Sequence, residues 1–138
     1  MSATDSCVLD EPTAKSTILV VEDDVLVRHA VTEFLRDSGF RVLGAVNGEE
    51  AVTVLSADVQ VDAVFSDVIM PGRLNGFALA GWMKTNRPNI PVLLTSGYAG
   101  MERRAAQLGT EVPVLDKPYE FRILLERIHR MIRQPHVA

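Results

Sequence analysis

The stretch TILVVEDD, residues 17–24, places a run of aliphatic and β-branched residues directly before three acids. A short apolar run of this kind is typical of a buried β-strand. Three more such runs end in polar side chains: VDAVFSD at 61–67, IPVLLTS at 90–96 and VPVLDKP at 112–118. The carboxyl ends of neighbouring strands in a parallel sheet lie along one edge, so we expect these polar residues to converge in one crevice.

Helical patterns separate the strand runs. Predicted strands cover 17–21, 41–46, 61–66, 90–95 and 112–115, and predicted helices cover 25–38, 48–57, 75–86, 100–108 and 119–133. This alternation with short connections favours right-handed crossovers and a parallel sheet with helices on both faces. We therefore predict an α/β fold with a doubly wound, five-stranded parallel sheet in the order 2-1-3-4-5, whose second strand, which begins with Arg41, lies at an edge.

Length and composition indicate one folded domain. The chain has 138 residues, of which 47% are hydrophobic and 23% are charged, and this is ordinary for a globular protein with a core. We expect a flexible leader at residues 1–16, because it is rich in Ser, Thr, Asp, Glu and Pro, then the domain at 17–133 and a short tail at 134–138. The initiating methionine and the leader favour a native full-length chain.

Charge and hydropathy argue against two classes of partner. The net charge of −4 argues against a nucleic-acid binder, which usually carries a basic patch. The longest apolar runs are shorter than the roughly 20 residues that a membrane helix needs, and the N-terminus lacks a basic segment followed by an apolar one. We therefore predict a cytoplasmic protein without membrane or nucleic-acid partners. Cys7 is the only cysteine, which excludes an intrachain disulfide.

The acids of the predicted crevice suit a hard divalent cation. Mg²⁺ takes oxygen ligands and is usually held by one or two carboxylates together with water and phosphate oxygens. We expect Asp23 and Asp67 to be direct ligands. Glu22 or Asp24 would act through water, and we place Glu22 in that role. The backbone carbonyl of Ile69, two residues after Asp67, would complete the protein ligands of a Mg²⁺ cofactor.

The remaining polar residues suit phosphoryl transfer. A carboxylate can attack phosphorus and form an aspartyl phosphate, and Asp67 is the candidate nucleophile because it stands alone at its strand end. Lys117, before Pro118, and Thr95 are expected to donate to the transferring oxygens. The sequence leaves the isomer of the Lys117-Pro118 peptide open. Each motif alone is compatible with an ordinary strand end, and the combination points to catalysis.

Other charged residues are assigned structural places. Arg28 is expected on the solvated face of the first helix, opposite its apolar stripe. Asn47 is expected to cap the second helix. Glu49 and Glu50 lie in the first turn of that helix, where the macrodipole favours negative charge. These two acids therefore need no catalytic explanation.

The motifs taken together resemble those of the receiver domain of two-component response regulators. The resemblance covers residues 16–133 and lies in VVEDD at 20–24, SDVIMPG at 66–72, TS at 95–96 and DKPY at 116–119. It implies the flavodoxin-like (βα)5 receiver fold. It also implies that Asp67 accepts a phosphoryl group from the phosphohistidine of a sensor histidine kinase or a histidine phosphotransfer protein. Thr95 would then turn toward the phosphate and Lys117 would pair with it.

By the same resemblance, the signal would reach a protein effector through the face formed by the fourth helix, fifth strand and fifth helix. We expect the chain to be a monomer or weak homodimer. Two departures from the family pattern matter. Val114 stands where many members carry an aromatic switch residue, and the loop at 70–76 is one residue longer than in the single-domain chemotaxis members. Ile69 and Gly97 lack the polar side chains that often place the attacking water, so we predict slow loss of the phosphoryl group.

The leading hypothesis is a stand-alone receiver that signals through a protein partner or a phosphorelay. It would be no enzyme beyond catalysing its own phosphorylation and dephosphorylation. One alternative is a pseudo-receiver that binds partners without phosphorylation, and another is a receiver fragment of a hybrid histidine kinase. A hydrolase or phosphotransferase of small molecules would use the same carboxylates, but the short strand-to-helix connections leave little chain for a substrate pocket.

Overall fold

The computed structural model describes residues 15–97 and 112–133. Its strands are β2 (Thr17–Val21), β3 (Arg41–Ala45), β4 (Ala63–Asp67), β5 (Val92–Ser96) and β6 (Val114–Asp116). Its helices are α2 (Val25–Asp37), α3 (Gly48–Ser56), α4 (Gly76–Asn86) and α6 (Phe121–Arg133). All strand pairings are parallel and run in the order β3-β2-β4-β5-β6. This confirms the predicted order 2-1-3-4-5, with the strand that begins at Arg41 at one edge.

The predicted helix at 100–108 lies outside the described residues. The other elements begin and end within two residues of their predicted bounds. Asp67 and Ser96 are the last residues of β4 and β5 rather than the residues that follow them. The strand β6 begins at Val114, because Pro113 has no N–H to donate and joins the sheet only through its carbonyl, which accepts from the N–H of Leu94 at 3.0 Å.

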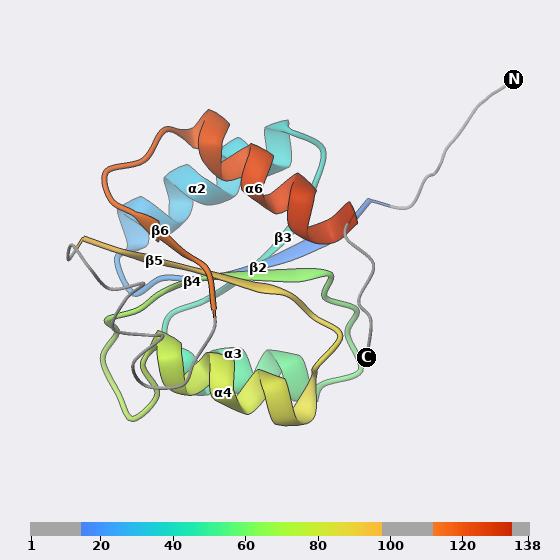
Figure 1. The fold of residues 1–138 in the computed structure, drawn as a ribbon, viewed down its shortest axis with the longest axis vertical. Coiled ribbons are helices and arrows are strands. Elements are labelled where there is room, and N and C mark those ends of the chain that lie inside the picture. The colour runs from blue at the N-terminus through green and yellow to red at the C-terminus, as the bar shows by residue number, and fades with distance from the viewer. Residues whose placement is uncertain (1–14, 98–111, 134–138) are drawn as a thin grey trace, which may run out of the picture.

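Helices α2 and α6 cover one face of the sheet, and α3 and α4 cover the other (Figure 1). Ile18 and Val20 of β2 face the core beneath α2 and α6, while Leu19 and Val21 face the core beneath α3 and α4. All four are at most 1% exposed, and burying one such side chain stabilises the fold by about 1.5–3 kcal/mol. The sheet is therefore apolar on both faces, and polar chemistry is confined to its ends.

Local capping sets where the helices begin and end. Asp24 caps α2 by accepting from the backbone N–H groups of Leu26 and Val27, at 2.9 and 3.2 Å. Asn47 caps α3, as predicted, by accepting from the backbone N–H of Glu50 at 2.8 Å. None of the helices in residues 15–97 and 112–133 is long and apolar enough to span a membrane.

Candidate functional site

The register of the sheet brings the polar strand ends together. The paired residues of β2 and β4 end immediately before Glu22 and Asp67, so these two acids are neighbours. Asp67 is itself paired with Thr95 of β5. At the end of β6, the backbone N–H of Lys117 donates to the carbonyl of Ser96 at 2.8 Å. The predicted crevice therefore draws on the ends of four adjacent strands.

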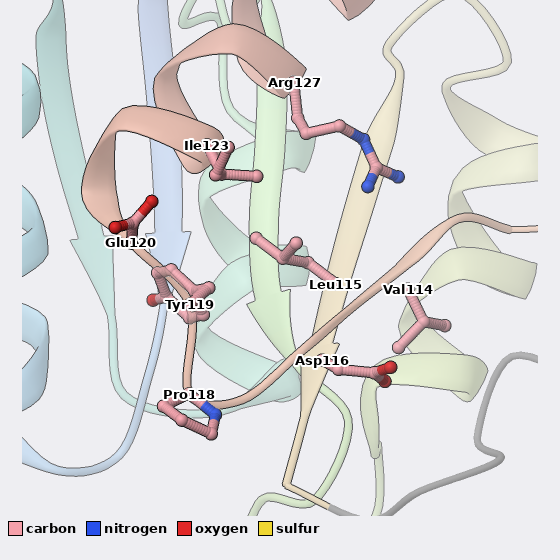
Figure 2. A pocket seen from close by; sticks show the side chains of 8 residues that line it. All are labelled: Val114, Leu115, Asp116, Pro118, Tyr119, Glu120, Ile123 and Arg127. Atoms are coloured by element: carbon pink, nitrogen blue, oxygen red, sulfur yellow. The ribbon is translucent and has the colours of Figure 1, made fainter.

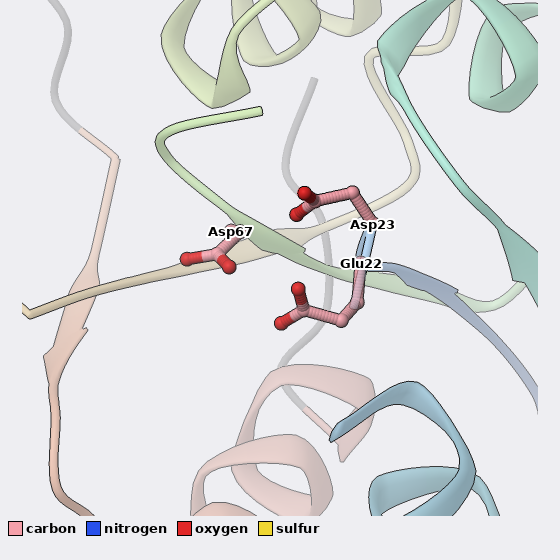
Figure 3. Close-up of side chains that lie close together, drawn as sticks. All are labelled: Glu22, Asp23 and Asp67. Carbon is pink, nitrogen blue, oxygen red and sulfur yellow. The ribbon is translucent and has the colours of Figure 1, made fainter. Parts of the chain in front are cut away.

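An acidic cluster forms where β2 and β4 end. Glu22 and Asp23 project from the end of β2 toward Asp67, and carboxylate oxygens of the three lie within 4.8 Å of one another (Figure 3). Glu22 and Asp67 are only 6% and 9% exposed, whereas Asp23 is exposed. Carboxylate oxygens gathered at this spacing are the ligands that Mg²⁺ prefers. The donor set therefore fits a magnesium ion that Asp23 and Asp67 would hold directly and Glu22 through water.

Glu22 has an unusual proton affinity for a glutamate. Burial raises its pKa to about 7, and a hydrogen bond with Asp67 and the charge of Asp67 act in the same direction. The backbone N–H of Asp24, which donates to Oε2 of Glu22 at 3.1 Å, opposes the increase. At neutral pH, burial and repulsion between the two neighbouring carboxylates therefore favour a proton on Glu22. A cation bound between them would remove the repulsion that favours the proton.

Lys117 supplies the positive charge of the crevice. Its Nζ lies 3.1 Å from Oδ1 and 3.1 Å from Oδ2 of Asp67. The Asp67 side chain is 11% exposed, so this ion pair is screened less than a surface pair. The peptide between Lys117 and Pro118, whose isomer the sequence leaves open, is cis.

Thr95 is close to Asp67 through its backbone but not through its hydroxyl. The side chain is 2% exposed, and Oγ1 donates to the carbonyl of Leu115 at 2.8 Å. In this structure the hydroxyl therefore ties β5 to β6. Reaching a group on Asp67 would require the side chain to rotate away from Leu115.

Ile69 lies in the loop that leaves β4 beside the site. The loop begins where Val68 donates its N–H to the carbonyl of Thr95, at 2.9 Å, and it closes where Gly76 donates to the carbonyl of Val68, at 2.7 Å. A Cβ at Gly76 would lie 2.5 Å from the carbonyl oxygen of Asp67, so only glycine allows this closure. The Ile69 side chain is 54% exposed, and its backbone follows the site by two residues.

Arg28 was predicted to lie on the solvated face of the first helix, and this describes only part of its side chain. It is half-buried, and its Nη1 donates to the backbone carbonyl of Glu22 at 2.7 Å. Its aliphatic stem packs over Gly44, where an added Cβ would lie 3.4 Å from Cδ of Arg28. Helical periodicity predicts which face a residue occupies, but not that a long side chain folds back over the acidic turn.

Glu49 is a second residue whose contact the sequence did not reveal. It was expected only to complement the helix macrodipole, yet its Oε2 accepts from the backbone N–H of Arg73 at 2.7 Å. Arg73 belongs to the loop that contains Ile69. The unusual length of this loop could have drawn attention to Glu49, because a longer loop has more backbone groups that need hydrogen-bond partners from other elements.

A shallow hollow of about 470 Å³ lies between β6 and the start of α6 (Figure 2). Val114, Tyr119 and Arg127 are among its lining residues. The Tyr119 ring packs edge-on against Phe65, with the ring centroids 5.9 Å apart. Burial raises the pKa of Tyr119 to about 12, and the nearby charges of Glu22 and Asp67 act in the same direction. The phenol that lines the hollow therefore stays neutral near pH 7.

Sequence comparisons place this geometry among known proteins. The family model described as Response regulator receiver domain matches residues 18–129. The response regulator protein FleR of Pseudomonas aeruginosa is 35% identical over 114 residues, which cover 82% of this chain and 24% of FleR. The chain spans between about a quarter and about half of the length of the curated relatives it matches.

Solved structures agree with this assignment. A response regulator receiver protein from Sinorhizobium medicae is 25% identical, with a TM-score of 0.78 over 86% of this chain and 94% of that chain. The receiver domain of the hybrid histidine kinase CckA is 34% identical, with a TM-score of 0.70 over 86% of this chain and 100% of that chain. The family match covers most of the chain and includes the acidic cluster and Lys117, and we conclude that this chain belongs to the response regulator receiver domain family.

Proposed function

We propose that the chain accepts a phosphoryl group on Asp67 from the phosphohistidine of a sensor histidine kinase or a histidine phosphotransfer protein. Receiver domains act in two-component signalling, and the finer proposal concerns the residues that do the chemistry here. The observation that carries it is the contact of Lys117 Nζ with both carboxylate oxygens of Asp67, 3.1 Å each, beside the acids Glu22 and Asp23. A nucleophile, a cation and a metal-type donor set thus share one crevice.

In the proposed transfer, a carboxylate oxygen of Asp67 forms a bond to phosphorus while the N–P bond of the donor breaks. The electron pair of that bond returns to the imidazole nitrogen, so no other reactant is required. Lys117 stays beside the phosphoryl oxygens and offsets part of their charge. Asp23, Asp67 and the carbonyl of Ile69 would hold Mg²⁺, with Glu22 acting through water. When bound, Mg²⁺ supplies positive charge against the transferring oxygens.

Thr95 is the proposed link between the phosphoryl group and the rest of the molecule. Its hydroxyl now donates to the neutral carbonyl of Leu115. A phosphoryl group on Asp67 would offer charged acceptor oxygens, which form stronger hydrogen bonds than a neutral carbonyl. Turning toward them would release β6 from this contact. The proposed output is therefore a change around Val114 and α6, where a protein effector or the next phosphorelay protein would bind.

The surroundings of the acidic cluster support docking of a protein donor. Val25 and Leu26, which follow the acidic turn, are 61% and 77% exposed, and Ile69 beside Asp67 is 54% exposed. Apolar side chains next to a charged centre suit a protein partner that brings its own phosphohistidine into the crevice. A small phosphate donor has no apolar surface of its own with which to contact these side chains.

Intact-mass measurement after incubation with acetyl phosphate and Mg²⁺ tests the proposal. We expect a mass gain of one phosphoryl group in the wild type and none in Asp67→Asn, which keeps the shape of the side chain but cannot form the acyl phosphate. Lys117→Met should slow the gain while leaving Asp67 in place. If neither acetyl phosphate nor a phosphohistidine protein gives a gain, the alternative of a phosphorylation-independent receiver is favoured instead.

A further inference from the structure

Glu49 makes a direct contact with the loop that follows the proposed phosphoacceptor. Its Oε2 accepts from the backbone N–H of Arg73 at 2.7 Å. The neighbouring Gly72 has a φ of +96°, and a Cβ there would lie 2.7 Å from Oε1 and 2.9 Å from Oε2 of Glu49. The loop backbone therefore lies against the carboxylate, in a conformation and at a distance that glycine alone permits.

The residue before Glu49 makes a second contact with the same loop. A Cβ at Gly48 would lie 2.5 Å from the Cβ of Leu74 and 2.6 Å from its carbonyl oxygen. The first turn of α3 thus packs on Leu74 through Gly48 and binds Arg73 through Glu49. Two adjacent residues of one helix hold two adjacent residues of the loop.

The charge on Glu49 strengthens its hydrogen bond. The backbone N–H of Arg73 is the largest cause that holds the pKa of Glu49 below its usual range, and the N–H groups of Glu49 itself and of Leu74 add to it. A hydrogen bond to a carboxylate is stronger than one to a neutral acceptor. Glu50, the next residue, instead accepts from the backbone N–H of Val46 at 2.9 Å, and so serves α3 rather than the loop.

The loop has few other attachments between its ends. The buried side chain of Met70 packs in the core beneath α3 and α4. After Met70, the contacts of Gly72, Arg73 and Leu74 with α3 are those that hold the loop before it closes at Gly76. Ile69 directly precedes Met70 and lies three residues before Gly72. A shift of residues 72–74 would therefore reach the Ile69 carbonyl through the backbone of Met70 and Pro71.

We propose that Glu49 is a positioning residue, which holds the backbone at residues 72–74 and thereby orients the carbonyl of Ile69 for a divalent cation. The inference rests on the proposed function, because that function assigns the cation to Asp23, Asp67 and Ile69. Glu49 itself does not bind the ion. It acts on the cation site through the loop.

Isothermal titration calorimetry with Mg²⁺ on the whole chain tests this role. Glu49→Ala should weaken Mg²⁺ binding about tenfold, the low end of the effect of losing a residue that orients a metal ligand. Glu50→Ala removes the same charge from the same helical turn but leaves the loop contact, so binding should stay within about twofold of the wild type. Glu49→Gln should fall between them, because its amide oxygen can still accept from Arg73.

Hydrogen exchange at the Arg73 amide gives a second measure. It should quicken in Glu49→Ala and stay unchanged in Glu50→Ala. Equal weakening of Mg²⁺ binding by the two alanine variants would overturn the proposal, since charge alone would then explain it. The proposal would also be overturned if Glu49→Ala bound Mg²⁺ with wild-type affinity although hydrogen exchange at its Arg73 amide was faster.

The pair Glu49→Gln and Glu50→Gln repeats the comparison if the alanine variants fold poorly. Their difference in Mg²⁺ affinity should have the same sign, and no difference between them counts against the proposal. A wild type that binds no Mg²⁺ and gains no phosphoryl group would instead overturn the proposed function, and the role of Glu49 with it.

Discussion

The two segments that border the acidic cluster are held in different ways. The turn at residues 22–24 is joined to the end of β3, where the N–H of Glu22 donates to the carbonyl of Ala45 at 2.9 Å, and is otherwise held by its own helix: Asp24 caps α2, and Arg28 binds the carbonyl of Glu22 from six residues away. The loop at residues 68–75 is fixed in part by Glu49, which lies 24 residues before Arg73 in the sequence. The turn is therefore held by α2 and the end of β3, and the loop by the docking of α3.

This difference has a functional side. The turn carries the acids Glu22 and Asp23, and its described backbone contacts are with α2 and β3. The loop carries the carbonyl of Ile69, whose position changes if α3 shifts. Substitutions in α3 should therefore affect the loop side of the site and spare the turn side.

The largest effect on stability is expected from Gly48→Ala, which disturbs the contact of α3 with the loop. The new Cβ would lie 2.5 Å from that of Leu74, so the loop or α3 must move. Overpacking of this kind typically costs about 1–3 kcal/mol of the free energy of unfolding, measurable by urea denaturation. Gly81→Ala is the matched control, because a Cβ at that helical position meets nothing within 4 Å. It should stabilise by up to about 1 kcal/mol. Unchanged stability in Gly48→Ala would contradict the close docking of α3 on the loop.

The next effect concerns the turn side and depends on pH. The pKa of Glu22 is raised from 4.5 to about 7 on folding, so the folded state retains a proton that the unfolded chain has lost between these values. Stability should therefore fall as pH rises through this window. Glu22→Gln removes the titration, and near neutral pH without Mg²⁺ it should be more stable than the wild type by on the order of 2 kcal/mol.

Urea unfolding at a series of pH values measures this difference. The curves of wild type and Glu22→Gln should approach each other at acidic pH and separate as pH rises. Addition of Mg²⁺ should narrow the separation by stabilising the charged form of Glu22. Parallel curves across the whole window would show that Glu22 has an ordinary proton affinity.

A smaller effect is expected from Asp24→Ala, which removes the cap of α2. Loss of an N-cap acid typically costs about 1 kcal/mol, and thermal unfolding should record it. Because the Asp24 side chain accepts from Leu26 and Val27 and has no described contact with the loop, hydrogen exchange at those two amides should quicken while that of Arg73 does not change. A parallel change at Arg73 would mean that turn and loop are coupled, contrary to the comparison above.

The smallest effect on stability is expected from Ile69→Asn. The side chain is 54% exposed, so the free energy of unfolding should change by less than about 0.5 kcal/mol. The amide could place a water molecule for attack on the aspartyl phosphate, so the phosphoryl group should be lost faster than in the wild type. Decay of the intact-mass signal measures its lifetime. A wild-type lifetime of only seconds would contradict the predicted slow loss.

Patterns that are local in the sequence predicted most of the fold. Each strand run and each amphipathic helix shows its own periodicity, and the alternation of the two leaves few possible topologies. The meeting of Glu22, Asp23 and Asp67 followed from topology as well, because the ends of adjacent parallel strands share an edge. The cap at Asn47 was readable from residue type alone.

What the sequence did not reveal depends on side-chain direction or on long-range contact. The hydroxyl of Thr95 can point toward Asp67 or toward β6, and only its rotamer decides that it bonds to Leu115. Arg28 was assigned to solvent because periodicity describes faces and not the reach of a long side chain. The contact of Glu49 with Arg73 depends on the positive φ of Gly72, which the spacing of residues in the sequence does not predict.

The two-sided burial of β2 carries a consequence for protein engineering. Deleting one residue from this strand would exchange the faces of its remaining side chains, and aliphatic residues would still fill both cores. The hydrophobic pattern thus tolerates the slip, whereas polar contacts such as the bond from the Thr17 N–H to Asp62 Oδ2, 2.7 Å, oppose it. Such a deletion mutant would still unfold cooperatively, but Glu22 and Asp23 would be displaced from Asp67. A library screen that selects only for expression would therefore retain chains with a disrupted site.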